Sequence, residues 1–318
     1  MSRVLSAASG LLRKMRRVQR SLGAMIEHKI FVPSIEFFLA DTCNLRCNNC
    51  APSSPFMSEA NLPSLESFIE SLSFLSRVVR CDELRLLGGE PLLNKDICSF
   101  IRAAKESGIF RSVLVVTNGL LLPRMSEEFW QLTDSVRISV YPATTGTFSE
   151  ATLESLRATA SRSGTRLEVV RTTHFMEAIR DTRIEDASVV KRTFSNCAEA
   201  HGWSCHLLYR NLLYRCSRVH TLDRYLGKIG VEHENFTDQD GIVIDGRSSL
   251  FADLKNYMKS SRPLKACSFC LGTSGALVEH RQLTVQQIRS KMSGPVREFA
   301  SRKSIEVSER VRRERTID

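Results

Sequence analysis

Residues 35–171 alternate between short apolar runs and segments with a helical repeat, and this alternation restricts the fold more than any other feature. The apolar runs predict five strands, at 35–40, 83–87, 112–117, 136–141 and 166–171. Helical periodicity predicts the intervening helices, at 64–78, 94–107, 126–133 and 149–163. Such alternation folds as a parallel sheet with right-handed crossovers. Apolar strand sequences are typical of sheets that helices cover.

Three cysteines, Cys43, Cys47 and Cys50, follow the first predicted strand within eight residues. Active sites of parallel α/β folds lie at the carboxyl ends of the strands, where this loop begins. A structural zinc ion takes four protein ligands, so three thiols would need a distant fourth cysteine. An iron–sulfur cube binds one thiolate at each iron, so three thiolates leave the fourth iron open to another ligand.

Two glycine-containing turns follow the next two predicted strands. They are GGEP (88–91) after the second strand and TNG (117–119) at the end of the third. Glycine lets a ligand approach the backbone closely, and the carboxylate of Glu90 can accept a hydrogen bond from a ligand ammonium group. Each motif alone is a weak turn signal. In this order, each at a strand end, they indicate one site.

The cysteine loop and both turns resemble the radical S-adenosylmethionine superfamily, which has C-x3-C-x2-C after the first strand of a partial barrel. The resemblance implies an α/β protein with a partial (β/α)6 TIM-type barrel of parallel strands. It implies that Cys43, Cys47 and Cys50 hold a [4Fe-4S] cluster whose open iron binds S-adenosylmethionine. Reductive cleavage would then give a 5′-deoxyadenosyl radical, while the protein supplies positioning and excludes water.

The same resemblance implies which residues contact S-adenosylmethionine. They are Gly88, Gly89, Glu90, Pro91, Thr117, Asn118 and, on the fourth strand, Ser139. The residue before the third cysteine departs from the family pattern, because many members have an aromatic residue where this chain has Asn49. Adenine packing is therefore expected from Phe38, or from Val169 and Val170.

Five further cysteines form a second group, at Cys197, Cys205, Cys216, Cys267 and Cys270. Four thiolates would fully ligate a second [4Fe-4S] cluster, and the arrangement resembles the twitch module, a shortened relative of the SPASM domain. Cys216, Cys267 and Cys270 are predicted ligands. Cys197 and Cys205 compete for the fourth place, and spacing slightly favours Cys197. Zinc bound by four cysteines is the alternative, because C-x2-C pairs serve zinc equally well.

The strand–helix alternation stops near residue 195, which suggests four segments. These are a basic N-terminal helical segment (1–32), the barrel (33–194), a small cysteine-rich α+β module (195–283) and a basic C-terminal helical tail (284–318). Inside the module, a hairpin is predicted with Asn211 at its turn. In the SPASM pattern a glycine takes this place, five residues before a cysteine, so Asn211 departs from that pattern.

The net charge of +10 comes from the two ends of the chain. Residues 1–32 contribute 7 − 1 = +6 and residues 284–318 contribute 9 − 5 = +4, so the middle is formally neutral. Nucleic-acid binding would favour a basic stripe across the body. Basic tails instead indicate solvated helix faces, or a weak contact of the N-terminal segment with a membrane surface. No apolar run is long enough to span a membrane and no secretory signal is present, so we expect a cytoplasmic protein.

The two clusters together predict the kind of reaction. A deoxyadenosyl radical abstracts hydrogen from a C–H bond, and a second cluster could accept an electron from the resulting substrate radical. The resemblance to twitch enzymes implies a small carbohydrate- or cyclitol-like substrate. The enzyme would either oxidise this substrate, as a dehydrogenase, or dehydrate it. A flavodoxin or ferredoxin-type protein would supply the electron. Arg171 and His174, at the end of the fifth strand, are candidate catalytic residues, since a base there could take the hydroxyl proton during oxidation.

Two alternatives remain. One is a radical S-adenosylmethionine maturase of a ribosomal peptide, although such enzymes are usually longer and carry two auxiliary clusters. The other is a non-catalytic zinc or iron–sulfur binding module.

Overall fold

The computed structural model of the protein describes residues 17–24, 26–57 and 62–293. Both predicted terminal helical segments lie largely outside these ranges. Residues 17–24 are helical, with Val18 and Leu22 more than half exposed. The described part of the C-terminal segment forms helix α11 (Val285–Ser293). No described helix combines the length and the apolar character needed to cross a membrane.

The core of the fold is one sheet whose first five strands are parallel. The strands are β1 (Ile30–Ala40), β2 (Val79–Gly88), β3 (Phe110–Thr117), β4 (Ser135–Val140) and β5 (Arg166–Arg171). Each pairs in parallel with the next along the chain. The predicted α/β class with parallel strands is therefore confirmed. Strand β1 begins at Ile30, so it extends across the predicted segment boundary between residues 32 and 33.

The sheet grows at its other edge in a way that the sequence did not reveal. Strand β7 (His206–Tyr209) pairs in parallel with β1, and β8 (Leu212–Tyr214) and β9 (Gly241–Val243) follow antiparallel. The next segment after β5 is β6 (His174–Glu177), which leaves the sheet and pairs antiparallel with β10 (Ala276–Glu279). The sixth parallel strand of the sheet is thus β7, beside β1 rather than beside β5.

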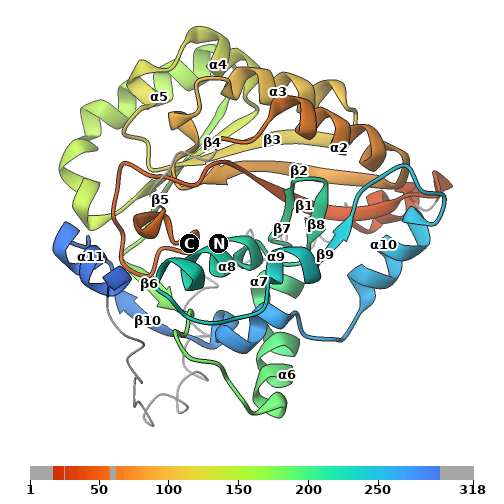
Figure 1. The fold of residues 1–318 in the computed structure, drawn as a ribbon. Helices are drawn as coiled ribbons and strands as arrows, with labels where there is room; N and C mark the ends of the chain where they lie inside the picture. Colours follow the sequence, from red (N-terminus) through yellow and green to blue (C-terminus); the bar gives the residue numbers. More distant parts are fainter. Residues whose placement is uncertain (1–16, 25, 58–61, 294–318) are drawn as a thin grey trace, which may run out of the picture.

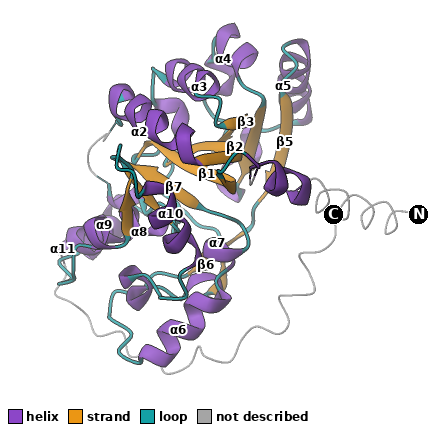
Figure 2. Ribbon diagram, turned by 90° about the vertical axis from the view of Figure 1, so that its right-hand side faces the viewer, coloured by secondary structure: helices purple, strands orange, loops and turns teal. Residues whose placement is uncertain are grey.

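Four helices cover one face of the sheet, as Figures 1 and 2 show. They are α2 (Leu65–Val78), α3 (Ile97–Glu106), α4 (Glu127–Leu132) and α5 (Glu150–Arg162), close to the predicted ranges. Phe37 on β1 packs here against Phe68 and Phe100, with ring centroids 4.3 and 5.6 Å away. Burial of three such rings stabilises this layer by several kcal/mol, at roughly 1.5–3 kcal/mol each.

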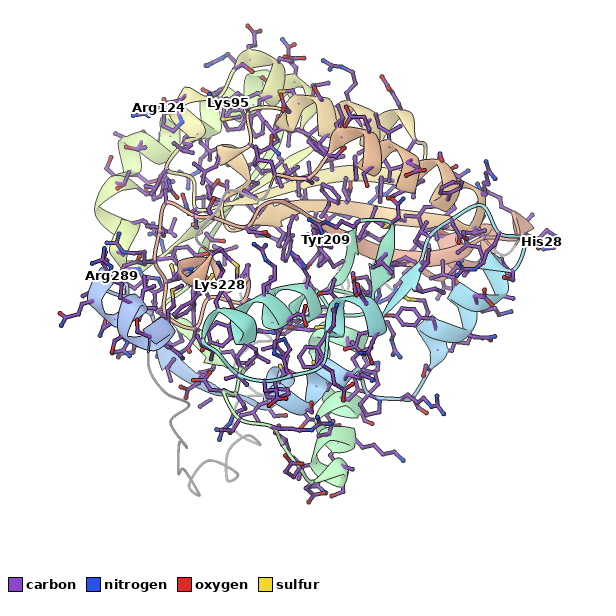
Figure 3. All side chains as sticks on the ribbon, in the orientation of Figure 1. His28, Lys95, Arg124, Tyr209, Lys228 and Arg289 are labelled. Carbon is purple, nitrogen blue, oxygen red and sulfur yellow. The ribbon has the colours of Figure 1, made fainter. Side chains whose placement is uncertain are left out.

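The opposite face of the sheet carries the second half of the chain. Its helices are α6 (Ala187–Asn196), α7 (Ala198–His201), α8 (Arg218–Lys228) and α9 (Phe236–Gln239). Helix α10 (Leu250–Lys259) instead buries Leu250 and Leu254 in the core that contains Phe37. Because successive strand residues point to opposite faces, Phe38 turns away from Phe37. It packs in a second hydrophobic core, on the face opposite α2 and α3. Tyr209, labelled in Figure 3 between the sheet and α8, lies on the His220 ring at 3.8 Å.

The hairpin of β7 and β8 turns at Arg210 and Asn211. Both residues have positive φ angles, 47° and 57°, which is the conformation of a two-residue turn that asparagine tolerates well. The predicted turn at Asn211 is therefore confirmed. Its amide also donates to Glu70 on α2 at 2.8 Å, which fixes the hairpin to the sheet's helical layer.

Candidate active site

The first cysteine loop lines a cavity of about 320 Å³ at the carboxyl ends of the strands. Cys43, Cys47 and Cys50 all contribute to its wall. The ends of β2, β3 and β4 supply the facing residues Leu87, Gly88, Gly89, Val116, Thr117, Asn118, Ser139 and Tyr141. The volume suits a small-molecule site. The structure therefore brings together the three thiols and most of the residues predicted to bind S-adenosylmethionine.

Gly88 and Gly89 allow the end of β2 to pack against the start of the cysteine loop. A Cβ on Gly88 would lie 2.2 Å from the carbonyl oxygen of Ala40, and one on Gly89 would lie 2.2 Å from that of Thr42. The same contact contains a hydrogen bond from the Gly89 amide to Ala40, at 2.7 Å. These glycines are needed for a backbone-to-backbone approach that places the cysteines, in addition to lining the cavity.

Glu90 does not take the predicted position. Its side chain is fully buried. It accepts hydrogen bonds from the Thr117 hydroxyl at 2.6 Å and from the backbone amides of Asn118 and Leu92, at 2.9 and 3.2 Å. Neither Glu90 nor Pro91 is part of the cavity wall. The structure therefore does not bring Glu90 to a place where it would receive a ligand ammonium group. Its carboxylate instead joins the turns after β2 and β3, and burial raises its pKa.

Asn118 and Ser139 face the cavity from β3 and β4. The Asn118 side-chain amide donates to Asn44 at 2.6 Å and lies 3.7 Å from the Cys43 sulfur. It thereby ties the end of β3 to the cysteine loop. Ser139 hydrogen-bonds with the neighbouring Tyr141, whose pKa burial raises.

Cys47 has partners from a segment that the sequence analysis did not single out. The side-chain amide of Gln282 donates to the Cys47 sulfur at 3.1 Å, and His280 Nε2 lies 3.1 Å from the same atom. The His280 ring stacks on Tyr141, with centroids 5.0 Å apart and planes inclined by 11°. A backbone hydrogen bond from Asn48 to Arg281 holds the two segments together at 2.9 Å.

The thiols of this loop are largely enclosed, and burial raises the pKa of Cys43 and of Cys47 to about 12. Both thiols are therefore protonated at neutral pH in the free protein. A thiol releases its proton when it coordinates a metal, so binding of iron would convert these thiols to thiolates.

The residues proposed for adenine packing are not placed at the cavity. Phe38, Val169 and Val170 do not line it, because Phe38 is enclosed in the second core and Val170 is exposed to solvent. Tyr141, Phe175, Met176 and Trp203 are among the larger side chains of the wall instead.

Of the two candidate bases, only His174 reaches the cavity. It is the first residue of β6, and its Nδ1 lies 3.0 Å from the hydroxyl of Thr173. Arg171 ends β5 and is exposed, outside the cavity wall.

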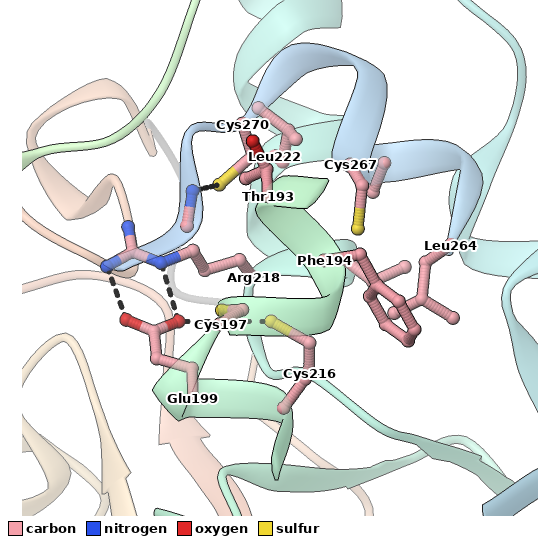
Figure 4. Close-up of a pocket in the computed structure, with 14 residues that line it drawn as sticks. Thr193, Phe194, Cys197, Glu199, Cys216, Arg218, Leu222, Leu264, Cys267 and Cys270 are labelled. Atoms are coloured by element: carbon pink, nitrogen blue, oxygen red, sulfur yellow. Dashed lines mark hydrogen bonds and ion pairs between the residues drawn. The ribbon is translucent and has the colours of Figure 1, made fainter. Parts of the chain in front are cut away.

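Four cysteines of the second group surround a smaller cavity of about 30 Å³, shown in Figure 4. Cys197 joins α6 to α7, Cys216 follows β8, and Cys267 and Cys270 belong to the turn after α10. Burial raises the pKa of Cys216, Cys267 and Cys270. The cavity wall is mostly apolar, with Phe194, Leu222 and Leu264 among its members.

Cys205 lies apart from this cavity. It directly precedes β7, whose pairing with β1 places it beside Glu36, and the two side chains are hydrogen-bonded. Burial and the charge of Glu36 raise the pKa of Cys205. The structure thus gathers Cys197 with the three cysteines that were predicted ligands, and it separates Cys205 from them.

Gly272 lies in the wall of the second cysteine cavity. Its φ of +53° strains any other residue, and a Cβ would lie 3.0 Å from the Cys197 sulfur, a tight contact. Its amide donates to the Cys270 sulfur at 3.2 Å. Hydrogen bonds of this kind stabilise a thiolate.

Each cysteine group fits a cluster by its chemistry and by the cavity it encloses. A cubane cluster takes each thiolate on its own iron, so its ligands surround it instead of meeting at one ion. Within the described ranges, no three His, Cys, Asp or Glu side chains lie close enough to share a single metal ion.

Comparison with known proteins agrees with the geometry of the first site. Residues 38–172 match the family model of the Radical SAM superfamily. The chain therefore contains a radical SAM domain, on β1 to β5 and the loops that carry Cys43, Cys47 and Cys50.

Several similar proteins are GTP 3′,8-cyclases. The enzyme of Heliobacterium modesticaldum is 36% identical over 92 residues, 28% of each chain, and that of Synechocystis sp. is 29% identical over 157 residues, 46% of this chain and 47% of the relative. Human molybdenum cofactor biosynthesis protein 1 is 35% identical over 89 residues, 27% of this chain and 14% of its own length. The chain thus spans less than half the length of these relatives. They are named cyclases, so they do not support the predicted oxidoreductase or dehydratase reaction.

Among solved structures, BtrN in complex with AdoMet and 2-DOIA is 13% identical. The match covers 77% of this chain and 90% of that one, with a TM-score of 0.40. Native anSMEcpe with bound AdoMet is 14% identical over 45% of this chain and 44% of that one, with a TM-score of 0.35.

Proposed function

We propose that the protein is a radical S-adenosylmethionine enzyme that oxidises a small, uncharged, carbohydrate- or cyclitol-like substrate. One observation carries the proposal: the two cysteine groups line adjoining cavities whose walls share Glu199 and Arg218. A substrate in the larger cavity would lie between a site that generates a radical and a site that can take up an electron. The twitch-like organisation of residues 195–283 is part of this proposal.

The residues would divide the work as follows. Cys43, Cys47 and Cys50 would hold the first [4Fe-4S] cluster, and Cys197, Cys216, Cys267 and Cys270 the second. When bound, the first cluster with S-adenosylmethionine supplies a 5′-deoxyadenosyl radical, and the second accepts one electron. Gly88, Gly89 and Asn118 would position the amino and carboxylate groups of S-adenosylmethionine, as the resemblance implies. Ser139 and Tyr141 would face its sugar and base.

The chain's own contribution to the reaction is enclosure and proton transfer. His174 on β6 would take the hydroxyl proton of the substrate, because oxidation of an alcohol to a ketone removes one hydrogen atom, one electron and one proton. Among the described residues that line the larger cavity, Arg218 is the sole Arg or Lys, and Glu199 already pairs with it. A neutral substrate suits such a wall better than a triphosphate, which would call for several unpaired cations.

The test is anaerobic reconstitution of the full chain. We expect about eight irons per chain, four for each cluster. With S-adenosylmethionine and dithionite in place of the protein electron donor, 5′-deoxyadenosine should form. Deuterated cyclitols should transfer deuterium into it and leave a ketone. Transfer from GTP or from a precursor peptide instead would contradict the proposed substrate class. Bound zinc without sulfide would contradict the enzyme proposal itself.

A further inference from the structure

A buried ion pair, Glu199 with Arg218, separates the two cysteine groups. Arg218 donates from Nε to one carboxylate oxygen at 2.7 Å and from Nη2 to the other at 2.6 Å. Both residues are less than a tenth exposed. Figure 4 shows the two parallel contacts, with Glu199 also directed toward Cys216. Bidentate pairs of this geometry are among the stronger charged contacts in proteins.

The pair is placed by the cysteines' own segments. Glu199 lies two residues after Cys197 on α7, and Arg218 lies two residues after Cys216 at the start of α8. Both side chains line the smaller cavity and the larger one. A charge at this position can therefore act on groups bound in either cavity.

The geometry is that of a guanidinium with an ionised carboxylate, because Arg218 donates one N–H to each oxygen of Glu199. A buried pair often gives no more stability than apolar residues of similar size. Stability therefore does not by itself explain charges at this place.

The charges act on thiols of both groups. Arg218 and Glu199 share the wall of the larger cavity with Cys50 and the wall of the smaller one with Cys216. An oxygen of Glu199 lies 3.9 Å from the sulfur of Cys216. A cation at this place favours negative charge in either cavity, and the carboxylate beside it opposes that effect.

We propose that the Glu199–Arg218 pair sets the reduction potentials of two iron–sulfur clusters, one in each cavity. A cluster gains negative charge on reduction, so a nearby cation stabilises its reduced state and a nearby anion destabilises it. Because the pair lies between the cavities, it would act on the substrate-side electron acceptor and on the radical-generating site together. This inference rests on the proposed function, since it requires clusters in both cavities.

The test is an anaerobic redox titration of the reconstituted protein, followed by electron paramagnetic resonance. Glu199→Gln leaves the cation of Arg218 uncompensated, so both clusters should become easier to reduce. Arg218→Gln leaves the anion of Glu199, so both should become harder to reduce. At a fixed solution potential we expect at least about a tenfold change in the reduced-to-oxidised ratio of the second cluster, or about 59 mV for one electron.

Two controls keep the result interpretable. The double variant Glu199→Gln/Arg218→Gln removes both charges, so its shift should be smaller than either single shift, and it avoids a lone buried charge that could prevent folding. Arg157→Gln removes one member of an exposed ion pair on α5 and should leave both potentials unchanged. Unaltered potentials in Glu199→Gln and in Arg218→Gln, with both clusters present, would overturn the inference. Absence of clusters from the wild-type protein would count against the proposed function instead.

Discussion

Replacement of Cys47 by alanine is expected to abolish the formation of 5′-deoxyadenosine. Cys47 lies in the wall of the larger cavity and receives a hydrogen bond from Gln282. Without its thiolate, one more iron of the first cluster would lack a protein ligand, and the cluster should be lost or fail to bind S-adenosylmethionine productively. Since even outer partners of a metal site change affinity or activity by about 10–100-fold, loss of a ligand should reduce the rate by at least about 100-fold.

The measurement is the rate of 5′-deoxyadenosine formation under anaerobic conditions with dithionite, with iron determined in the same sample. Cys98→Ala is the matched control, because Cys98 lies on α3, outside both cavities. The control should keep wild-type iron and activity. A Cys47→Ala protein that still forms 5′-deoxyadenosine at the wild-type rate would remove the basis for the first site.

Replacement of Cys197 by alanine should remove the second cluster and leave the first in place. Cys197 shares its cavity with three other thiols, and Gly272 packs closely against its sulfur. We expect the iron content to fall by about four per chain. Formation of 5′-deoxyadenosine should persist, while conversion of substrate to ketone should stop, because the substrate radical has no electron acceptor.

Cys205→Ala provides the comparison for this experiment, since Cys205 lies beside Glu36 at the start of β7. It should keep about eight irons and full conversion of substrate. Iron analysis and product analysis on both variants give the answer together. The reverse pattern, with iron lost from Cys205→Ala and retained in Cys197→Ala, would refute the ligand set.

Local sequence patterns were enough to predict the parallel sheet. Apolar strand runs, helical repeats and the turn at Asn211 each depend on neighbouring residues, and the structure places them within a few residues of the expected positions. The cavity around Cys43, Cys47 and Cys50 follows from the same logic, because the carboxyl ends of parallel strands meet at one edge.

The remaining features depend on contacts between distant segments. Nothing near Glu90 in the sequence indicates that Thr117 and Asn118 would donate hydrogen bonds to its carboxylate. His280 and Gln282 reach Cys47 across more than 230 residues. The contacts of His280 and Gln282 depend on the pairing of β6 with β10 outside the main sheet, which no local pattern signals.

The choice between Cys197 and Cys205 was undecided for a similar reason. The two lie eight residues apart in segments of comparable composition, and their spacing to Cys216 discriminates only weakly. What separates them is the pairing of β7 with β1, which places Cys205 against Glu36 on the sheet. The ion pair of Glu199 and Arg218 was likewise missed, because its two members come from different helices.

The central claim is that the thiols of Cys43, Cys47 and Cys50 hold a cluster with one iron open to S-adenosylmethionine. Its most direct test is electron paramagnetic resonance of the reduced Cys197→Ala protein, which isolates the first cluster. Addition of S-adenosylmethionine should change the spectrum of that cluster. Isotopic labelling of the amino nitrogen of S-adenosylmethionine should produce a resolved coupling between that nitrogen and the cluster. A cluster whose spectrum does not respond to S-adenosylmethionine, or a protein without iron, would contradict the account.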